Sequence, residues 1–434
     1  MQKLLSLIRS NTGRALSGSF ATSLLAKFAQ IAMSILAARL LQPAGFGIFT
    51  FSLGVGLLGG RLGGLGWPVL MNRLVPKYRV DENWSDLRGL VRAAHMTVIA
   101  GAVLCSLLCA GIALWVGPED RLYSGLLLGA FLIPIMAFRS LYRNLLAALR
   151  IPQKGIMVDE LLPAAFMVLA LVFLMQTTLN TQTAVVWYLA ASGTAVLTGA
   201  FWIWKNLPIE LGTVLPDYSK FRLWMGIALP ALIGMSARLL MNKTDVLMLA
   251  PLGTMEDVGY YSAALRATYV QTAAVVVLST VVTARISEAF AAGREKQGKR
   301  LFFGALAFAL ACSVPLAIPL IFWDNWIMTT FFGDSYELGA PVLQILAISQ
   351  IGAAVIIPAS SLMLMTGRQA RFGQMTTGAL VANICLNIVL IPKMGATGAA
   401  LATCISILSL ATFQLMACAL IIRSRQYEEV KKTK

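Results

Sequence analysis

The sequence predicts an all-α membrane protein with 12 transmembrane helices, arranged as two parallel-repeat six-helix bundles around a central cationic cavity. Three observations lead to this fold class. Of the 434 residues, 58% are hydrophobic and 12% are charged, whereas soluble domains carry about 25% charged residues. Apolar runs of about 20 residues, the length that crosses a bilayer, recur along the whole chain. Lysine and arginine gather in the short segments between these runs.

Each predicted helix is one apolar run, bounded by charged or turn-forming residues. The segment before the first run contains Lys3, Arg9 and Arg14, and that run exceeds 20 residues without a small-residue cleavage site. We therefore expect a retained first helix rather than a signal peptide. The twelve runs predict helices at about 17–41, 46–72, 91–116, 122–148, 156–176, 183–204, 223–250, 258–284, 301–322, 338–365, 371–391 and 396–422.

The distribution of positive charge predicts the orientation of these helices. If the N-terminus lies inside, the inner segments, counted with the basic helix ends at Arg92, Arg139, Arg143 and Arg371, hold 27 of the 35 Lys and Arg residues. The outer loops hold two, Arg121 and Lys393. Cytoplasmic loops attract positive charge, so we expect a multi-pass protein of the bacterial inner membrane with both termini in the cytoplasm. Topology also explains the net charge of +16, and nucleic acid is therefore not an expected partner.

Six helices in each half start on the same side of the membrane, which predicts a parallel repeat. An offset of 212 residues aligns Gly47 with Gly259, a faint trace of that repeat. The expected organisation is an N-terminal bundle at 1–204, a cytoplasmic linker at 205–222, and a C-terminal bundle with a short basic cytoplasmic tail at 223–434.

Polar residues in the first two helices point to a lumen. A charge at membrane depth costs about 2.5–3.5 kcal/mol on insertion scales, so it usually faces a cavity or a partner. Lys27 lies near the middle of the first span and shares one helical face with Gln30. In the second span, Arg61 lies among seven glycines. Those glycines predict either a helix break that lines a cavity or tight helix packing with a snorkelling arginine.

The second half carries a similar set of charges. Arg238 and Asp245 share one stripe of the seventh span, Lys243 lies beside them, and Arg266 follows in the eighth. Asp245 and Arg266 have similar predicted depths, so an ion pair and a role in substrate contact or coupling are equally open. The candidate substrate-binding residues are thus Lys27, Gln30, Arg61, Arg238, Lys243 and Arg266.

The sign of these charges separates two functions. Asp245 is the only acidic residue that the predicted helices place well inside a span, whereas an exporter of cationic drugs driven by protons or sodium needs buried carboxylates. A positive lumen suits a diphosphate or an acidic sugar. No catalytic residue, metal site or cofactor is expected. The outer segments are short, the six cysteines lie in apolar runs, and His95 has no arrangement of Ser, Cys or carboxylate around it.

Four segments resemble the polysaccharide-unit flippases of the multidrug/oligosaccharidyl-lipid/polysaccharide (MOP) exporter superfamily: AARLLQPAGFGIFTFSL, DVLMLAPLGTMEDVGYYSAALR, MTGRQAR and IPKMGATGAALAT. They keep their register over essentially the whole chain. The resemblance implies that a polyprenyl-diphosphate-linked oligosaccharide moves from the cytoplasmic to the outer leaflet for cell-surface polysaccharide synthesis, and that one half rocks against the other. It implies a lipid-linked anionic oligosaccharide, membrane lipids and other polysaccharide-assembly membrane proteins as partners. The alternative is a multidrug exporter of the same superfamily, and an enzyme is not expected.

Overall fold

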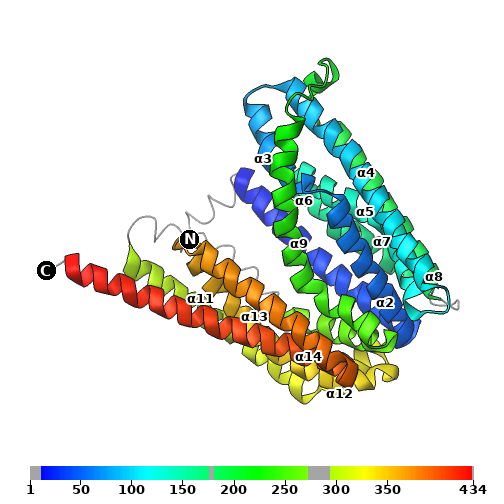
Figure 1. Ribbon diagram of the computed structural model, residues 1–434, viewed down its shortest axis with the longest axis vertical. Coiled ribbons are helices and arrows are strands. Elements are labelled where there is room, and N and C mark those ends of the chain that lie inside the picture. Colours follow the sequence, from blue (N-terminus) through cyan, green and yellow to red (C-terminus); the bar gives the residue numbers. More distant parts are fainter. Residues whose placement is uncertain (1–10, 175–179, 272–293, 433–434) are drawn as a thin grey trace. The chain divides into compact units, whose positions relative to one another are not determined.

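The computed structural model describes residues 11–174, 180–271 and 294–432 (Figure 1). Within these residues the secondary structure is helical, with no strand. The chain divides into two compact units, Met1–Leu247 and Met248–Lys434, which are described here one at a time. The expected bundle boundaries, with a linker at 205–222, stay a prediction.

The N-terminal unit is built around α5, which packs against α2, α3, α4 and α8. Figure 1 shows α4 and α5 running along each other. The helices of this unit are α2 (Asn11–Gly63), α3 (Trp67–Val80), α4 (Trp84–Val116), α5 (Arg121–Ala148), α6 (Pro152–Ile156), the π-helix η1 (Met157–Leu161), α7 (Leu162–Phe173), α8 (Thr181–Asn206), the 3-10 helix η3 (Ile209–Gly212) and most of α9 (Phe221–Leu252).

In the C-terminal unit, α13 packs against both α11 and α14. A helix at 255–271 follows α9. The other elements are α11 (Glu295–Phe322), α12 (Asp324–Ile327), the π-helix η4 (Met328–Phe332), the 3-10 helix η5 (Asp334–Gly339), α13 (Ala340–Met365) and α14 (Gln369–Lys432).

Eight helical stretches in the described residues are long and apolar enough to cross a membrane. Two of them, Ala21–Gly63 with 43 residues and Gln369–Ile422 with 54, have about twice the length that one crossing needs. Each contains a kink where the backbone is left-handed, at Gln42 (φ 59°) in α2 and at Gly395 (φ 53°) in α14. The kinks fall between pairs of predicted spans. The complete twelve-helix layout in two bundles stays a prediction.

The predicted helix 46–72 is interrupted in the structure. The second limb of α2 ends at Gly63, Leu65 and Gly66 have positive φ, and α3 begins at Trp67. Before this break the glycines of α2 also lie tightly against α5, because a Cβ added at Gly56 would come within 2.6 Å of the Leu132 Cβ. The glycines therefore serve both purposes that the sequence left open, helix packing and a helix break.

Candidate functional site

Six charged side chains meet in the N-terminal unit, where α2, α5 and η1 come together. We refer to them as the charge cluster. Its members are the cations Lys27, Arg61, Arg139 and Arg143 and the carboxylates Asp159 and Glu160.

The two carboxylates are adjacent in sequence, yet one arginine binds both. Arg143 Nη1 lies 2.8 Å from Asp159 Oδ2 and 2.6 Å from Glu160 Oε1. Successive side chains on a regular helix diverge by about 100°. Here the pair lies in the π-helix η1, a type of local bulge that is rare and often found at functional sites.

Arg139 forms the buried side of the charge cluster. Its side chain is 8% exposed, and its Nη2 lies 3.7 Å from Asp159 Oδ1. Nη1 donates to the Tyr188 hydroxyl at 3.0 Å, and Nη2 also donates to the backbone carbonyl of Asp159. A buried charge needs a partner and further hydrogen bonds to offset its lost hydration. These contacts supply both, so Arg139 fixes the position of Asp159.

Lys27 forms the accessible side of the charge cluster. Its side chain is 54% exposed, and its Nζ lies 3.1 Å from Glu160 Oε2 and 3.5 Å from Gln30 Oε1. Arg61 interacts electrostatically with Asp159 and donates to the Ser140 hydroxyl at 3.1 Å. Three residues predicted from the sequence, Lys27, Gln30 and Arg61, are thus placed at one site.

The remaining predicted residues lie on other parts of the chain. Arg238 belongs to α9, but its side chain lies outside the described residues. Lys243 is half-buried and Asp245 is buried, both in α9. The guanidinium of Arg266 lies over the Tyr269 ring, 5.3 Å from its centre. Asp245 and Arg266 belong to different units, so their pairing stays a prediction.

Sequence reasoning missed the two carboxylates and the two arginines that bind them. It counted Arg139 and Arg143 with an inner loop, whereas both lie in α5, a candidate span. Asp159 lies about 10 Å into the candidate span Pro152–Phe173 at 1.5 Å per residue, so Asp245 is not the only acidic residue well inside a span. The available signal was the spacing of Arg139 and Arg143, which places both on one helical face.

Comparison with known proteins gives two family matches. Residues 16–290 match the family described as polysaccharide biosynthesis protein, and residues 230–389 match the family described as MatE. A relative from Haloferax volcanii, described as a probable low-salt glycan biosynthesis flippase, Agl15, is 23% identical over 162 residues. That match covers 37% of this chain and 34% of the relative, so the alignment spans about a third of the length of the curated relative.

Solved structures share the fold over most of the chain. A multidrug resistance MATE family transporter of the MOP superfamily, in an inward-facing conformation, has a TM-score of 0.73 at 13% identity and covers 95% of this chain and 99% of its own. The lipid II flippase MurJ in an inward closed conformation has a TM-score of 0.72 at 16% identity, covering 93% of this chain and 87% of its own. At these identities the likeness is one of fold.

Proposed function

Because this chain belongs to the polysaccharide biosynthesis protein family, whose pattern matches residues 16–290, we propose that it flips a polyprenyl-diphosphate-linked oligosaccharide from the cytoplasmic to the outer leaflet for cell-surface polysaccharide synthesis. The resemblance to MOP-superfamily flippases, drawn from four sequence motifs, is confirmed by the family match and the shared fold. The chain is accordingly a multi-pass membrane transporter of that superfamily.

The observation that carries the proposal is the composition of the charge cluster. Four cations face two carboxylates among the described residues, so the site holds more positive than negative charge. Both carboxylates contact Arg143, whereas Lys27 has a mostly exposed side chain and reaches one of them. A diphosphate brings more negative charge than a single carboxylate and forms strong charge-assisted hydrogen bonds. The substrate then competes with Glu160 for Lys27.

In the proposed site, Arg139 and Arg143 position the carboxylates, whereas Lys27 and Arg61 contact the headgroup. Arg139 and Arg143 hold Asp159 and Glu160 in place, so Lys27 keeps a fixed resting partner. Arg61 supplies the second contact to the headgroup, because its planar guanidinium can donate two parallel hydrogen bonds to phosphate oxygens.

The seventh and eighth predicted spans contribute the second set of charges. We assign Arg238, Lys243 and Arg266 to the path of the anionic headgroup. Rocking of one bundle against the other moves the headgroup across, while the lipid tail stays in the bilayer. The sequence pattern of twelve spans and the parallel repeat support this arrangement. Other polysaccharide-assembly membrane proteins are the partners expected to consume the flipped product.

The test is a set of substitutions at the accessible cations. We expect Lys27→Ala and Arg61→Ala to reach the membrane at normal abundance and to lose most export of the sugar unit, with lipid-linked oligosaccharide accumulating on the inner leaflet. Arg61→Lys should keep part of the activity, because a point charge replaces a bidentate fork imperfectly.

Arg39→Ala is the matched control, since Arg39 lies in the same helix α2 but off the face that carries Lys27. It should leave export unchanged. Full export by both alanine variants of Lys27 and Arg61 at wild-type protein levels would remove these residues from the site.

One observation favours a second function, a multidrug exporter. Asp159 and Glu160 are carboxylates inside a candidate span, the feature that a transporter of cationic drugs needs. Their engagement with Arg139 and Arg143 weighs against it, because cations of the protein already occupy them. Efflux of a cationic dye in cells that express the chain decides the matter. Dye export that disappears with Glu160→Gln would favour the exporter over the flippase.

A further inference from the structure

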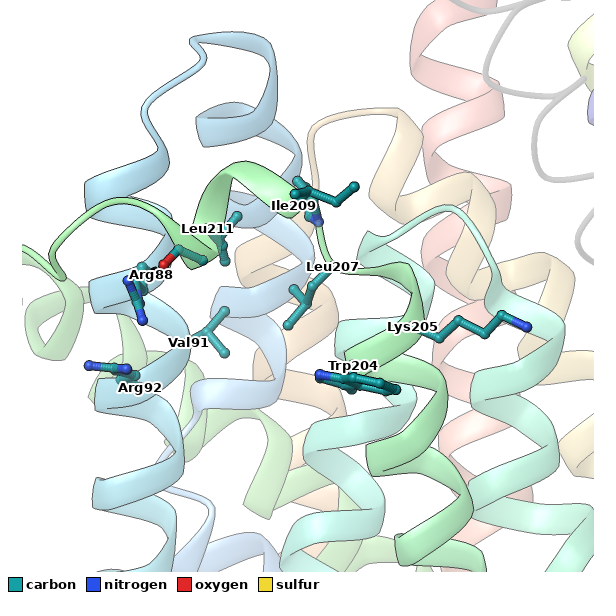
Figure 2. Close-up of a pocket in the computed structure, with 10 residues that line it drawn as sticks. Arg88, Val91, Arg92, Trp204, Lys205, Leu207, Ile209 and Leu211 are labelled. Carbon is teal, nitrogen blue, oxygen red and sulfur yellow. Dashed lines mark hydrogen bonds between the residues drawn. The ribbon is translucent and has the colours of Figure 1, made fainter.

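A cavity of about 690 Å³ opens between the first turns of α4, the last turn of α8 and η3 (Figure 2). We refer to it as the α4–α8 pocket. Three basic residues line it, Arg88, Arg92 and Lys205, and most of the other lining residues are apolar, including Trp204 and Leu207. It involves no member of the charge cluster, so it is a separate feature of the N-terminal unit.

Two arginines form its polar wall. Arg88 and Arg92 lie one turn apart on α4, so both project from the same face, and Figure 2 shows them beside each other with Lys205 pointing away. Arg88 Nη1 donates to the carbonyl of Gly212 at 3.3 Å and to the carbonyl of Val214. A guanidinium has five N–H donors, so donors beyond Nη1 can serve a ligand. Arg92 is exposed.

The face of α4 that carries Arg92 continues as an apolar surface. Met96, Ile99 and Val103 follow at four, seven and eleven residues, which is the spacing of one helical face. All three are exposed, Met96 to 62%. In a helix that crosses a membrane, exposed apolar side chains of this kind lie against lipid chains.

α8 carries a second exposed apolar face on the other side of the pocket. Leu197, Phe201 and Trp204 share one face at steps of four and three residues, and all three are exposed, Leu197 to 71% and Trp204 to 75%. Tryptophan is enriched where a membrane meets water. The pocket therefore joins exposed apolar helix faces to a pair of arginines near the ends of two candidate spans, Trp84–Val116 and Thr181–Asn206.

We propose that the α4–α8 pocket binds an anionic phospholipid of the leaflet at the face predicted to be cytoplasmic. Arg88 and Arg92 hold the phosphate, and the acyl chains lie on the exposed apolar faces of α4 and α8. Basic pockets between transmembrane helices on this side are a general way to bind acidic headgroups. η3 supplies one wall, so the bound lipid also holds the segment after α8 against α4.

The experiment measures lipid binding by the purified full-length protein with native mass spectrometry, using phosphatidylglycerol as the probe and phosphatidylcholine as the neutral comparison. Wild-type protein should retain phosphatidylglycerol in preference. Arg92→Gln should weaken that binding about fivefold, the effect of one Lys or Arg charge near a membrane surface. Arg92→Lys, which keeps the charge, should retain most of it. Arg73→Gln is the matched control, because Arg73 is exposed on α3 and is not among the residues that line the pocket.

Four results would overturn the proposal. The first is unchanged phosphatidylglycerol binding by Arg92→Gln, and the second is an equal loss in Arg73→Gln, which would indicate diffuse surface charge. Displacement of the lipid by millimolar inorganic phosphate would show a site for free anions. Preferential binding of undecaprenyl diphosphate at the pocket would assign it to the carrier of the transported sugar. None of these outcomes depends on whether Lys27 and Arg61 contact the transported headgroup.

Discussion

At the residue scale, Asp159 is the member of the charge cluster that balances the charge of two arginines, Arg139 and Arg143. It neutralises Arg143 at 2.8 Å and lies 3.7 Å from the buried Arg139. If its charge is lost, Arg139 keeps the hydroxyl of Tyr188 but loses its nearest carboxylate. Breaking a buried ion pair on one side leaves a charge in a poorly hydrated place, which costs more than the pair contributed when intact.

We therefore expect Asp159→Asn to lower the free energy of unfolding by about 3–5 kcal/mol. The measurement is the thermal unfolding of the purified protein in detergent. Glu119→Gln, which removes an exposed carboxylate between α4 and α5, should leave the unfolding temperature within error. An unfolding temperature of Asp159→Asn equal to that of wild type would mean that solvent, rather than Asp159, balances the arginines.

The same residues show what sequence patterns can predict about a site. Lys27 and Arg61 stand out because each is a cation in the middle of an apolar run. Asp159 and Glu160 stand near the end of a run and look like the edge of a loop. Their half-buried position in the charge cluster follows from the π-helix η1 and from Arg139 and Arg143, which come from α5. Neither feature follows from hydropathy, because both depend on contacts between separate helices.

At the scale of elements, the break between α2 and α3 depends on a close contact of two backbones. Gly66 has φ 77°, and a Cβ built on it would come within 1.9 Å of the Ala228 carbonyl oxygen in α9. Glycine is therefore required there for two reasons, the left-handed backbone and the approach of α9. Trp67 and Trp224, next to this contact, have ring centres 6.4 Å apart, so the start of α3 and the start of α9 form one packed joint.

Gly66→Ala should accordingly disrupt this joint. We expect the amount of folded protein in the membrane to fall several-fold, because alanine is disfavoured at positive φ and the added Cβ cannot be placed without moving α9. The readout is the monodisperse fraction after detergent extraction. Gly111→Ala is the control: Gly111 is a glycine of α4 with open space around it, and replacement by alanine in a helix is favourable. A normal yield of Gly66→Ala would contradict the contact with Ala228.

Helix positions were predicted well where one apolar run makes one helix. The expected ranges 122–148 and 301–322 end where α5 (Arg121–Ala148) and α11 (Glu295–Phe322) end. The prediction failed at 46–72, because the break at Leu65 and Gly66 is a matter of local backbone conformation inside an apolar segment. Hydropathy does not record such a break.

At the scale of the whole molecule, the segment after α8 is docked rather than loose. The backbone N–H of Asp217 donates to the Ser85 carbonyl at 3.1 Å, and Lys220 pairs with Asp86 in the first turn of α4. The hydrogen bond from Lys220 to the Asp86 carboxylate raises the pKa of Lys220, so this lysine stays charged through the neutral range. Ser219 donates to Asp217 through its backbone and its hydroxyl and lowers the pKa of that carboxyl group. The segment after α8 therefore belongs to the N-terminal unit and packs against the start of α4.

The orientation of the chain can be tested with reporter fusions. Positive charge predicts which connecting segments face the cytoplasm, and topology reporters read the side of the membrane directly. Fusions expected to report from outside follow Gln42, Asn180 and Thr254. Fusions expected to report from inside follow Lys154, Tyr218 and Arg368. A cytoplasmic signal from any of the first three, in the intact full-length protein, would overturn the twelve-helix arrangement.

The π-helix η1 is a place where the chain can lose one residue without a change in the helices on either side. A π-turn contains one residue more than the α-turn that it replaces, so Pro152–Phe173 behaves as a regular helix into which one residue has been inserted. Removing one residue from Met157–Leu161 would restore a regular α-helix and leave α7 in place, so Met167 and Leu171 would stay buried. Asp159 and Glu160 would then diverge by about 100° as on any regular helix, and a single arginine would no longer bind both. A one-residue deletion in η1 would thus separate the two carboxylates of the charge cluster without shortening any loop.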